Sequence, residues 1–195
     1  MYVGAMQDSF PHALELSKNG YNAFALIYRP DVNKAMADLA RAVAFIHENQ
    51  DELKVDVSAY SVWGGSAGGR MGAWLGIYGT GSFYEKEYPK PSAVIMQYTG
   101  LSSVTGNESP TYACVGTRDG IANYRIMERR IAKIKMLRIH TIFLTKHIRR
   151  AVRMESVLIA VIILIPIRKS CKGKFRCNAL ENLLCVHAFS YIYTV

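Results

Sequence analysis

The stretch that decides the fold is Val62-Trp63-Gly64-Gly65-Ser66-Ala67-Gly68-Gly69. The apolar run from Tyr60 to Trp63 predicts a short buried strand, and the run from Met71 to Tyr78 predicts a helix. Between them four glycines surround a single serine, which leaves room for a very tight turn. The sequence therefore predicts a strand, a sharp reversal and a helix.

Ser66 is the candidate nucleophile at the tip of this turn. In a Gly-x-Ser-x-Gly turn between strand and helix, the serine takes a strained conformation that exposes its hydroxyl, and this nucleophile elbow is typical of serine hydrolases. Gly64 and Gly68 stand where strand and helix pass too closely for a Cβ, and Gly65 completes the turn. The amide of Ala67 would donate to the oxyanion on an attacked carbonyl. The alternative is an ordinary turn whose serine caps the helix.

Outward from this turn, residues 1–135 alternate between strand-like and helix-like runs. The alternation is typical of an α/β fold, a mostly parallel sheet with crossover helices on both faces. Asn19-Gly20 is expected to end the first helix, and Asp31 or Asn33 to cap the second. Helices are expected at 10–18, from 31 or 33 to about 46, and at 123–135, and strands at 23–28, 57–63, 93–98 and 112–115.

Asp119 is the candidate acid. A serine hydroxyl needs a base, usually a histidine held by a carboxylate, and in the α/β-hydrolase layout the chain order is Ser, acid, His. Asp119 directly follows the expected strand 112–115, in Gly116-Thr117-Arg118-Asp119-Gly120. Open α/β sheets carry their sites beyond the carboxyl ends of the strands. The alternative is a turn aspartate before a glycine.

Of the three catalytic roles, the base has the least support in the sequence. His147 follows Asp119 at about the expected interval and is the candidate, with His140 as a weaker alternative. Three cationic residues near His147 would disfavour the imidazolium that a base must form, and no glycine adjoins it to make a tight loop. The other histidines lie far beyond this interval or precede Ser66, against the order: His12, His47 and His187.

Composition changes sharply near residue 136. The 195 residues suffice for one domain with a real core, and the net charge is +9. Residues 1–135 hold 14 Lys+Arg against 13 Asp+Glu, whereas residues 136–195 hold 10 against 2. Of the 15 glycines 14 precede residue 136, and three of the four cysteines follow it. The expected organisation is a core at 1–135 and a basic, compositionally distinct tail at 136–195.

Targeting signals are not visible. No apolar run approaches the roughly 20 residues of a transmembrane helix, and the N-terminus lacks the basic-then-apolar pattern of a signal peptide. These observations predict a cytoplasmic chain without a transmembrane segment.

The tail leaves several interpretations open. Its basic residues could meet nucleic acid or anionic lipid, but no binding motif accompanies them, so a solvated or disordered segment without a nucleic-acid partner is expected. Cys171, Cys177, Cys185 and His187 offer soft ligands, but their spacing is wider than that of zinc sites, so no metal is expected. Residues 157–165 fit either a strand or a short buried helix.

Residues 1–135 resemble the esterase/lipase-like α/β-hydrolases related to acetyl-esterases and feruloyl-esterase-type enzymes. Gly116-Thr117-Arg118-Asp119 matches the acid loop of that family. The other matching segments are Phe10-Pro11-His12-Ala13-Leu14-Glu15-Leu16, Asn22-Ala23-Phe24-Ala25-Leu26-Ile27-Tyr28-Arg29-Pro30, Asp38-Leu39-Ala40-Arg41-Ala42-Val43 and Trp63-Gly64-Gly65-Ser66-Ala67-Gly68-Gly69. The resemblance covers about two thirds of the chain and implies a partial α/β-hydrolase fold.

The departures from the family pattern lie at both ends. Family members carry a glycine-rich oxyanion loop after an earlier strand, and Met1-Tyr2-Val3-Gly4 resembles the residues just past it. They also continue into a strand and a loop with His followed by Gly, where this sequence changes character at Met136. The first strands and both loops are therefore expected to be missing. One hypothesis is that residues 136–195 are read out of frame or belong to a broken gene, which translation past codon 135 in the other frames would test.

The resemblance implies acyl transfer from a carboxylic ester to water through a Ser66 acyl-enzyme, with no cofactor and no metal. The implied partner is a small-molecule ester, an acetylated or aromatic-acylated carbohydrate among the candidates. Because the base and one oxyanion donor look missing, weak or absent activity is expected. The alternatives are a catalytically dead remnant that binds a small ligand, and a serine peptidase or amidase of the same fold.

Overall fold

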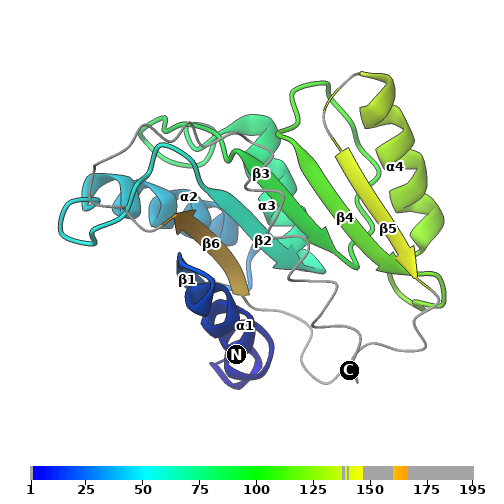
Figure 1. The fold of residues 1–195 in the computed structure, drawn as a ribbon. Helices are drawn as coiled ribbons and strands as arrows, with labels where there is room; N and C mark the ends of the chain where they lie inside the picture. Colours follow the sequence, from blue (N-terminus) through cyan, green and yellow to red (C-terminus); the bar gives the residue numbers. More distant parts are fainter. Residues whose placement is uncertain (1, 138, 140, 147–159, 167–195) are drawn as a thin grey trace.

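The computed structural model describes residues 2–137, 139, 141–146 and 160–166. Six strands form one sheet: β1 (Tyr21–Ile27), β2 (Ser61–Gly65), β3 (Ala93–Gln97), β4 (Thr111–Gly116), β5 (Thr141–Lys146) and β6 (Ala160–Pro166). Their order across the sheet is β1-β6-β2-β3-β4-β5 (Figure 1). Strands β2 to β5 are parallel, and only β6 runs antiparallel to its neighbours. The mostly parallel α/β sheet expected from the alternating pattern is confirmed.

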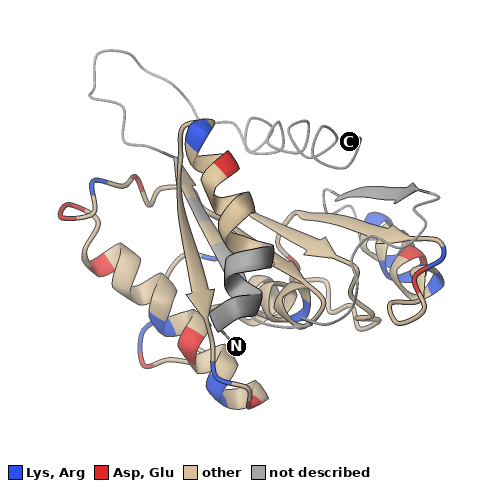
Figure 2. Cartoon of the chain, turned by 90° about the horizontal axis from the view of Figure 1, so that it is seen from below, with Lys and Arg blue, Asp and Glu red and all other residues tan. Residues whose placement is uncertain are grey.

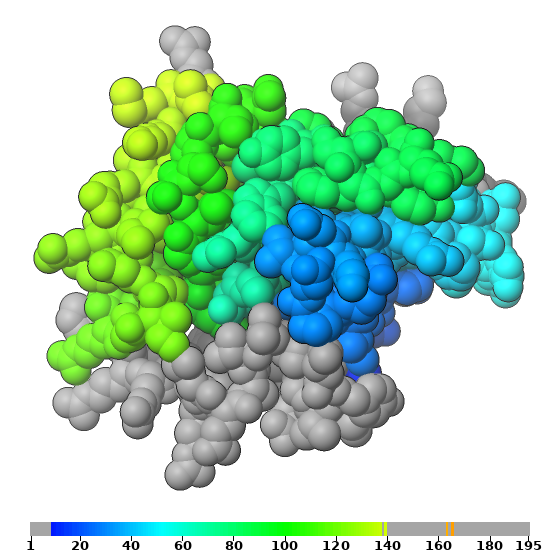
Figure 3. All heavy atoms as spheres, turned by 180° about the vertical axis from the view of Figure 1, so that it is seen from behind, coloured from blue at the N-terminus to red at the C-terminus, as the bar shows by residue number. Residues whose placement is uncertain are grey.

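Helices cover both faces of the sheet: α1 (Tyr2–Lys18), α2 (Val32–Glu48), α3 (Ala67–Tyr78) and α4 (Tyr124–Met136). Helix α1 packs on one face, where Leu16 contacts a cluster that includes Trp63 and Ile95. The other three helices lie side by side on the opposite face (Figure 3). Within the described part of the chain, no helix has both the length and the apolar composition to span a bilayer.

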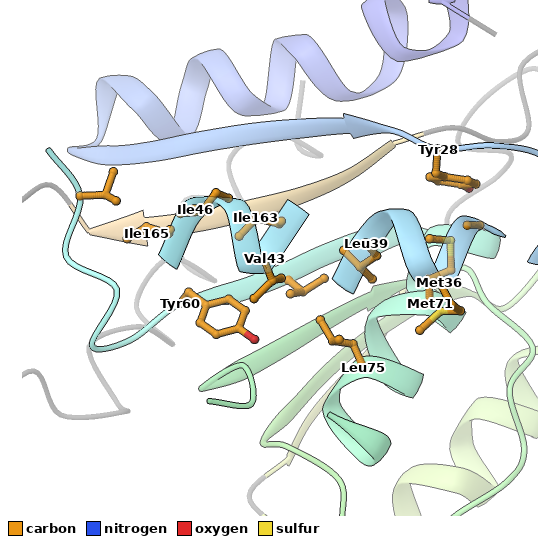
Figure 4. Close-up of a cluster of buried hydrophobic side chains, with 13 residues drawn as sticks. Tyr28, Met36, Leu39, Val43, Ile46, Tyr60, Met71, Leu75, Ile163 and Ile165 are labelled. Atoms are coloured by element: carbon orange, nitrogen blue, oxygen red, sulfur yellow. The ribbon is translucent and has the colours of Figure 1, made fainter. Parts of the chain in front are cut away.

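The larger core cluster lies between α2, α3 and the sheet (Figure 4). Helix α2 contributes a stripe of apolar residues at helical spacing, and all of them are buried: Met36, Leu39, Ala40, Val43 and Ile46. All of them except Ala40 belong to one cluster with Met71 and Leu75 of α3 and with Val62 and Ile163 of the sheet. This continuous apolar contact fixes the position of α3, the helix that follows the Ser66 turn.

Several predicted boundaries shift. Asp31 rather than Asn33 caps α2, because its carboxylate accepts from Lys34 N at 2.9 Å. Helix α1 begins at Tyr2 instead of residue 10 and contains Pro11, a residue that usually interrupts helices. Strand β2 begins at Ser61, since residues 57 and 58 form a turn before it. The expected stop is confirmed: α1 ends before Asn19-Gly20, and Gly20 has a φ of +86°.

Strand β6 lies between β1 and β2 in the sheet. These two strands are joined by the α2 crossover, yet each pairs with β6, so that Ile163 lies opposite Phe24 on one side and Val62 on the other. The continuous apolar run 160–166 suits a strand flanked on both sides. Of the two interpretations of 157–165, the strand is the one observed for residues 160–165, and residues 157–159 lie outside the described residues. The division of the chain at residue 135 stays a prediction.

Candidate active site

Ser66 lies at the junction between β2 and α3, outside both elements and half-buried. Its backbone has φ +50° and ψ −113°, a conformation that non-glycine residues adopt only under strain. Ser66 N donates to Gln97 O at 2.9 Å, and Ser66 O accepts from Arg70 N at 3.2 Å, so neighbouring backbone holds the turn. The hydroxyl makes no capping hydrogen bond to α3, so the helix-cap interpretation of this serine is wrong.

Glycines make the turn possible. A Cβ on Gly64 would lie 2.2 Å from Gly68 C and 2.5 Å from Gly69 N, both backbone atoms of α3. A Cβ on Gly69 would in turn lie 2.7 Å from Gly64 O. The predicted close passage of strand and helix is confirmed at Gly64, and Gly68 supplies the backbone that it meets.

The N-terminus of α3 faces the same turn. Ala67 is the first helical residue, so its N–H belongs to the first turn of a helix, where backbone donors have no partner within the helix. These donors carry the positive end of the helix dipole, which favours negative charge nearby. The assignment of Ala67 as an oxyanion donor is consistent with this position and stays a prediction.

Asp119 lies three residues beyond β4, half-buried, with its N–H donating to Gly116 O at 3.1 Å. Its Oδ1 accepts from Ile121 N and Ala122 N, each at 2.8 Å. Within the described residues no hydrogen bond is recorded at Oδ2. The backbone therefore fixes the carboxylate through one oxygen and leaves the other as an acceptor.

Strands β2, β3 and β4 bring Ser66 and Asp119 to the same end of the sheet, the end formed by the carboxyl ends of the strands. Their carboxyl ends are tied by Ser66 N to Gln97 O and by Tyr98 N to Cys114 O, at 2.9 and 2.8 Å. Two strand spacings separate β2 from β4, about 10 Å between backbones. An imidazole placed between the serine hydroxyl and the carboxylate spans a gap of this order.

The candidate bases His147 and His140 lie outside the described residues, as does His187. The described histidines both precede Ser66. His47 lies on α2, partly buried, with Nδ1 2.9 Å from Val43 O. His12 lies on α1, on the opposite face of the sheet.

Tyr98 also lies at this carboxyl end of the sheet, and the sequence did not identify it as part of the site. It follows β3 and has a φ of +37°, so it joins Ser66 as a strained non-glycine residue at the carboxyl end of a strand. A Cβ on Gly65 would lie 2.2 Å from Tyr98 Oη, so the phenol fits against the turn only because residue 65 is glycine. In sequence Tyr98 is an ordinary aromatic strand end, and nothing distinguishes it.

Other reactive groups at this edge are unsuited to nucleophilic or metal chemistry. Burial raises the pKa of the Cys114 thiol to about 12, so it stays protonated near neutral pH. In the part of the chain that the structure describes, no cluster of His, Cys, Asp and Glu could hold a metal ion. The cysteines of the tail lie outside that part.

Comparisons with known proteins agree with this fold. The BD-FAE family model matches residues 4–126. An acetyl ester-xyloside bifunctional hydrolase from Caldicellulosiruptor lactoaceticus has a similar structure, with 18% identity, a TM-score of 0.61 and coverage of 72% of this chain and 66% of that one. An α/β-hydrolase enzyme from a Medee basin deep-sea metagenome library follows at 20% identity and TM-score 0.60, covering 69% and 59%.

A sugar hydrolase from Lactococcus lactis is also similar, at 16% identity and TM-score 0.58, covering 72% of this chain and 67% of that one. The chain therefore spans between 59% and 67% of the length of these three structures. No curated protein sequence matches it significantly. At these identities the likeness shows a partial α/β-hydrolase fold, as the sequence predicted.

Proposed function

The chain belongs to the BD-FAE family, and on that premise we propose that it is a serine hydrolase of carboxylic esters. One observation carries the proposal: Ser66 is held at φ +50° without capping the helix that follows it. A conformation of this kind costs about 1–3 kcal/mol, and an ordinary strand–helix turn has no need of it. Exposure of a hydroxyl for attack is the function that accounts for the strain.

In the proposed mechanism Ser66 Oγ attacks the ester carbonyl and its proton passes to a histidine base, for which His147 is the candidate. Negative charge then develops on the carbonyl oxygen, and Ala67 N–H donates to it. Collapse of the tetrahedral intermediate expels the alcohol, which takes the proton from the imidazolium and leaves an acyl-enzyme. Water, deprotonated by the same base, releases the acid and restores the serine.

Asp119 is proposed to orient the base. Its Oδ1 is occupied by Ile121 N and Ala122 N, so the carboxylate cannot rotate freely. Oδ2 is then presented to the Nδ1–H of the imidazole, which fixes the tautomer and stabilises the imidazolium. This role needs neither a cofactor nor a metal.

Turnover is proposed to be slow. The cationic residues that flank the candidate base His147 in the sequence disfavour the imidazolium that it must form. We further propose a cytoplasmic chain with an α/β-hydrolase core at residues 1–135 and a basic, compositionally distinct tail at 136–195, in which the candidate base His147 lies. The similarity to an acetyl ester-xyloside hydrolase favours an acetylated carbohydrate as the substrate.

Initial rates on 4-nitrophenyl acetate, acetylated xylose and 4-nitroacetanilide test the proposal. The two esters should be hydrolysed slowly by the full chain, and Ser66→Ala should remove that activity. Ser58→Ala, on the exposed turn before β2, is the matched control and should retain it. Equal rates for Ser66→Ala and the parent would refute the proposal, and faster cleavage of the anilide would favour an amidase. Binding of acetylated xylose without turnover would indicate a remnant that only binds.

A further inference from the structure

Tyr98 has a backbone conformation that the turn after β3 does not by itself explain. Its φ is +37°, in the left-handed region that costs a non-glycine residue free energy. Glycine reaches this region without that cost, and asparagine reaches it at a smaller one. A turn alone would be better served by either of them. The strained tyrosine therefore indicates a role for its side chain.

Three consecutive residues at the end of β3 contact the serine turn. Gln97 O accepts from the N–H of the candidate nucleophile at 2.9 Å. The phenol of Tyr98 occupies the place that a Cβ on Gly65 would take, one residue before the nucleophile. Thr99 Cγ2 would lie 3.3 Å from a Cβ on Gly69, three residues after it. The end of β3 thus meets the turn before, at and after the serine.

No charged side chain takes part in these contacts. Residues 61–69 and 91–107 contain no Lys, Arg, Asp or Glu, so both segments are tan in Figure 2. The two segments therefore cannot hold one another by ion pairs. Close packing and backbone hydrogen bonds fix the serine turn on β3, and such contacts depend on shape.

Tyr98 also reaches the side of the site that carries the acid. Its N–H donates to Cys114 O of β4 at 2.8 Å. Tyr98 packs against the core cluster that includes Val115 and Ala122. Ala122 N in turn donates to Asp119 Oδ1 at 2.8 Å. One half-buried residue therefore touches both the turn that carries the serine and the core beneath the acid loop.

We propose that Tyr98 is a positioning residue, which sets the spacing between the hydroxyl of Ser66 and the carboxylate of Asp119. This role rests on the proposed function, because the spacing matters only if an imidazole works between the two groups. The phenol acts as a spacer that holds the serine turn at a fixed distance from the acid loop. An error of about 1 Å in such a geometry can lower the rate by about 10². Tyr98 itself does not touch the ester in this mechanism.

Variants of Tyr98 separate this role from a structural one through kcat and KM on 4-nitrophenyl acetate. Tyr98→Ala should lower kcat by about 10- to 100-fold with KM nearly unchanged, because the reacting groups are misplaced while the small ester still binds. Tyr98→Phe keeps the ring and should retain most of the rate. Tyr98→Gly relieves the backbone strain, so it should unfold at a higher temperature than Tyr98→Ala and yet be equally slow. Parent-like kcat in Tyr98→Gly would show that residue 98 serves the turn alone, and would overturn the proposal.

A double-mutant cycle tests the contact with the serine turn. Gly65→Ala should lower kcat in the parent, because its Cβ displaces the phenol. In the Tyr98→Gly background the same Cβ enters vacated space, so Gly65→Ala should cost little or restore part of the rate. Residues in contact show such coupling, whereas independent sites do not. Effects that simply multiply would contradict the proposal.

Tyr60→Phe is the matched control. It removes the hydrogen bond from Tyr60 Oη to Pro89 O, 2.8 Å long, at the opposite end of β2. It should lower Tm and leave kcat unchanged. Tyr98→Gly carries the test if Tyr98→Ala does not fold. A parent chain that neither hydrolyses the ester nor reacts with a fluorophosphonate at Ser66 would refute the proposed function and this role with it. A reactive parent whose kcat is unchanged in Tyr98→Ala and Tyr98→Gly would refute the role alone.

Discussion

Substitution of Gly64 by alanine is the sharpest test of the elbow. A Cβ at this position would lie 2.2 Å from Gly68 C, 2.4 Å from Gly68 O and 2.5 Å from Gly69 N. All three are backbone atoms, so no side chain can rotate away and the start of α3 must move. Overpacking typically costs 1–3 kcal/mol, and we expect Gly64→Ala to reach about 3 kcal/mol because rigid backbone opposes it. For a chain of this size that corresponds to a fall in Tm of about 6–12 °C.

Matched glycine variants isolate the geometry. A Cβ on Gly100 would meet nothing within 4 Å, so Gly100→Ala should leave Tm unchanged or slightly raised. Gly65→Ala should fall between the two, because its Cβ meets the end of a side chain, Tyr98 Oη, which can move. Thermal unfolding by circular dichroism measures all three. If Gly64→Ala unfolds at the same temperature as Gly100→Ala, strand and helix do not pass as closely as described, and the elbow argument is refuted.

Three further outcomes are expected. Asp119→Asn keeps the Oδ1 contacts to Ile121 N and Ala122 N but loses the charge, so ester turnover should fall by about 10³–10⁴ with Tm unchanged; an unaffected rate would remove Asp119 from the site. Glu108→Gln removes the one ionic partner that the fully buried guanidinium of Arg130 has among the described residues, the Glu108 carboxylate at 4.0 Å. It should lower the free energy of unfolding in urea by about 3 kcal/mol, more than Arg130→Met. Burial opposes ionisation of Glu108, but backbone N–H donors and Arg130 outweigh it and hold the pKa of Glu108 below its ordinary 4.5. The contribution of the ionised Glu108 to stability is therefore present above pH 4.5 and lost as the pH falls further. Equal stability of the two variants at neutral pH would contradict this account of the pair. Cys114, with its pKa raised to about 12 by burial, should resist iodoacetamide at pH 8 in the folded chain, as peptide mapping would show, and rapid alkylation would disprove its burial.

Local chemistry made much of the fold predictable. The elbow, the apolar stripe of α2 and the cap at Asp31 depend on residues close together in sequence, and the structure has each of them. Turn glycines and periodic apolar residues report such features directly. Boundaries were less predictable, as Pro11 inside α1 shows, because propensity is overridden by packing against the sheet.

Long-range pairing was beyond the sequence. Strand β6 pairs antiparallel with both neighbours, opposite Phe24 and Val62, at a sequence separation of about 100 residues or more. No local sequence pattern predicts that position in the sheet. Tyr98 was missed for a similar reason, since its strain and its contact with Gly65 exist only once β2 and β3 are paired. The candidate nucleophile and acid, Ser66 and Asp119, could be proposed from the sequence because chain order and the positions of the strand ends indicate them.

Covalent labelling tests the central claim most directly. The full chain is incubated with a fluorophosphonate, which reacts with an activated serine hydroxyl, and the modified peptide is identified by mass spectrometry. We predict a single adduct on Ser66 that is absent in Ser66→Ala and retained in Ser58→Ala. An unlabelled protein, or an adduct on another serine that survives in Ser66→Ala, would contradict the account.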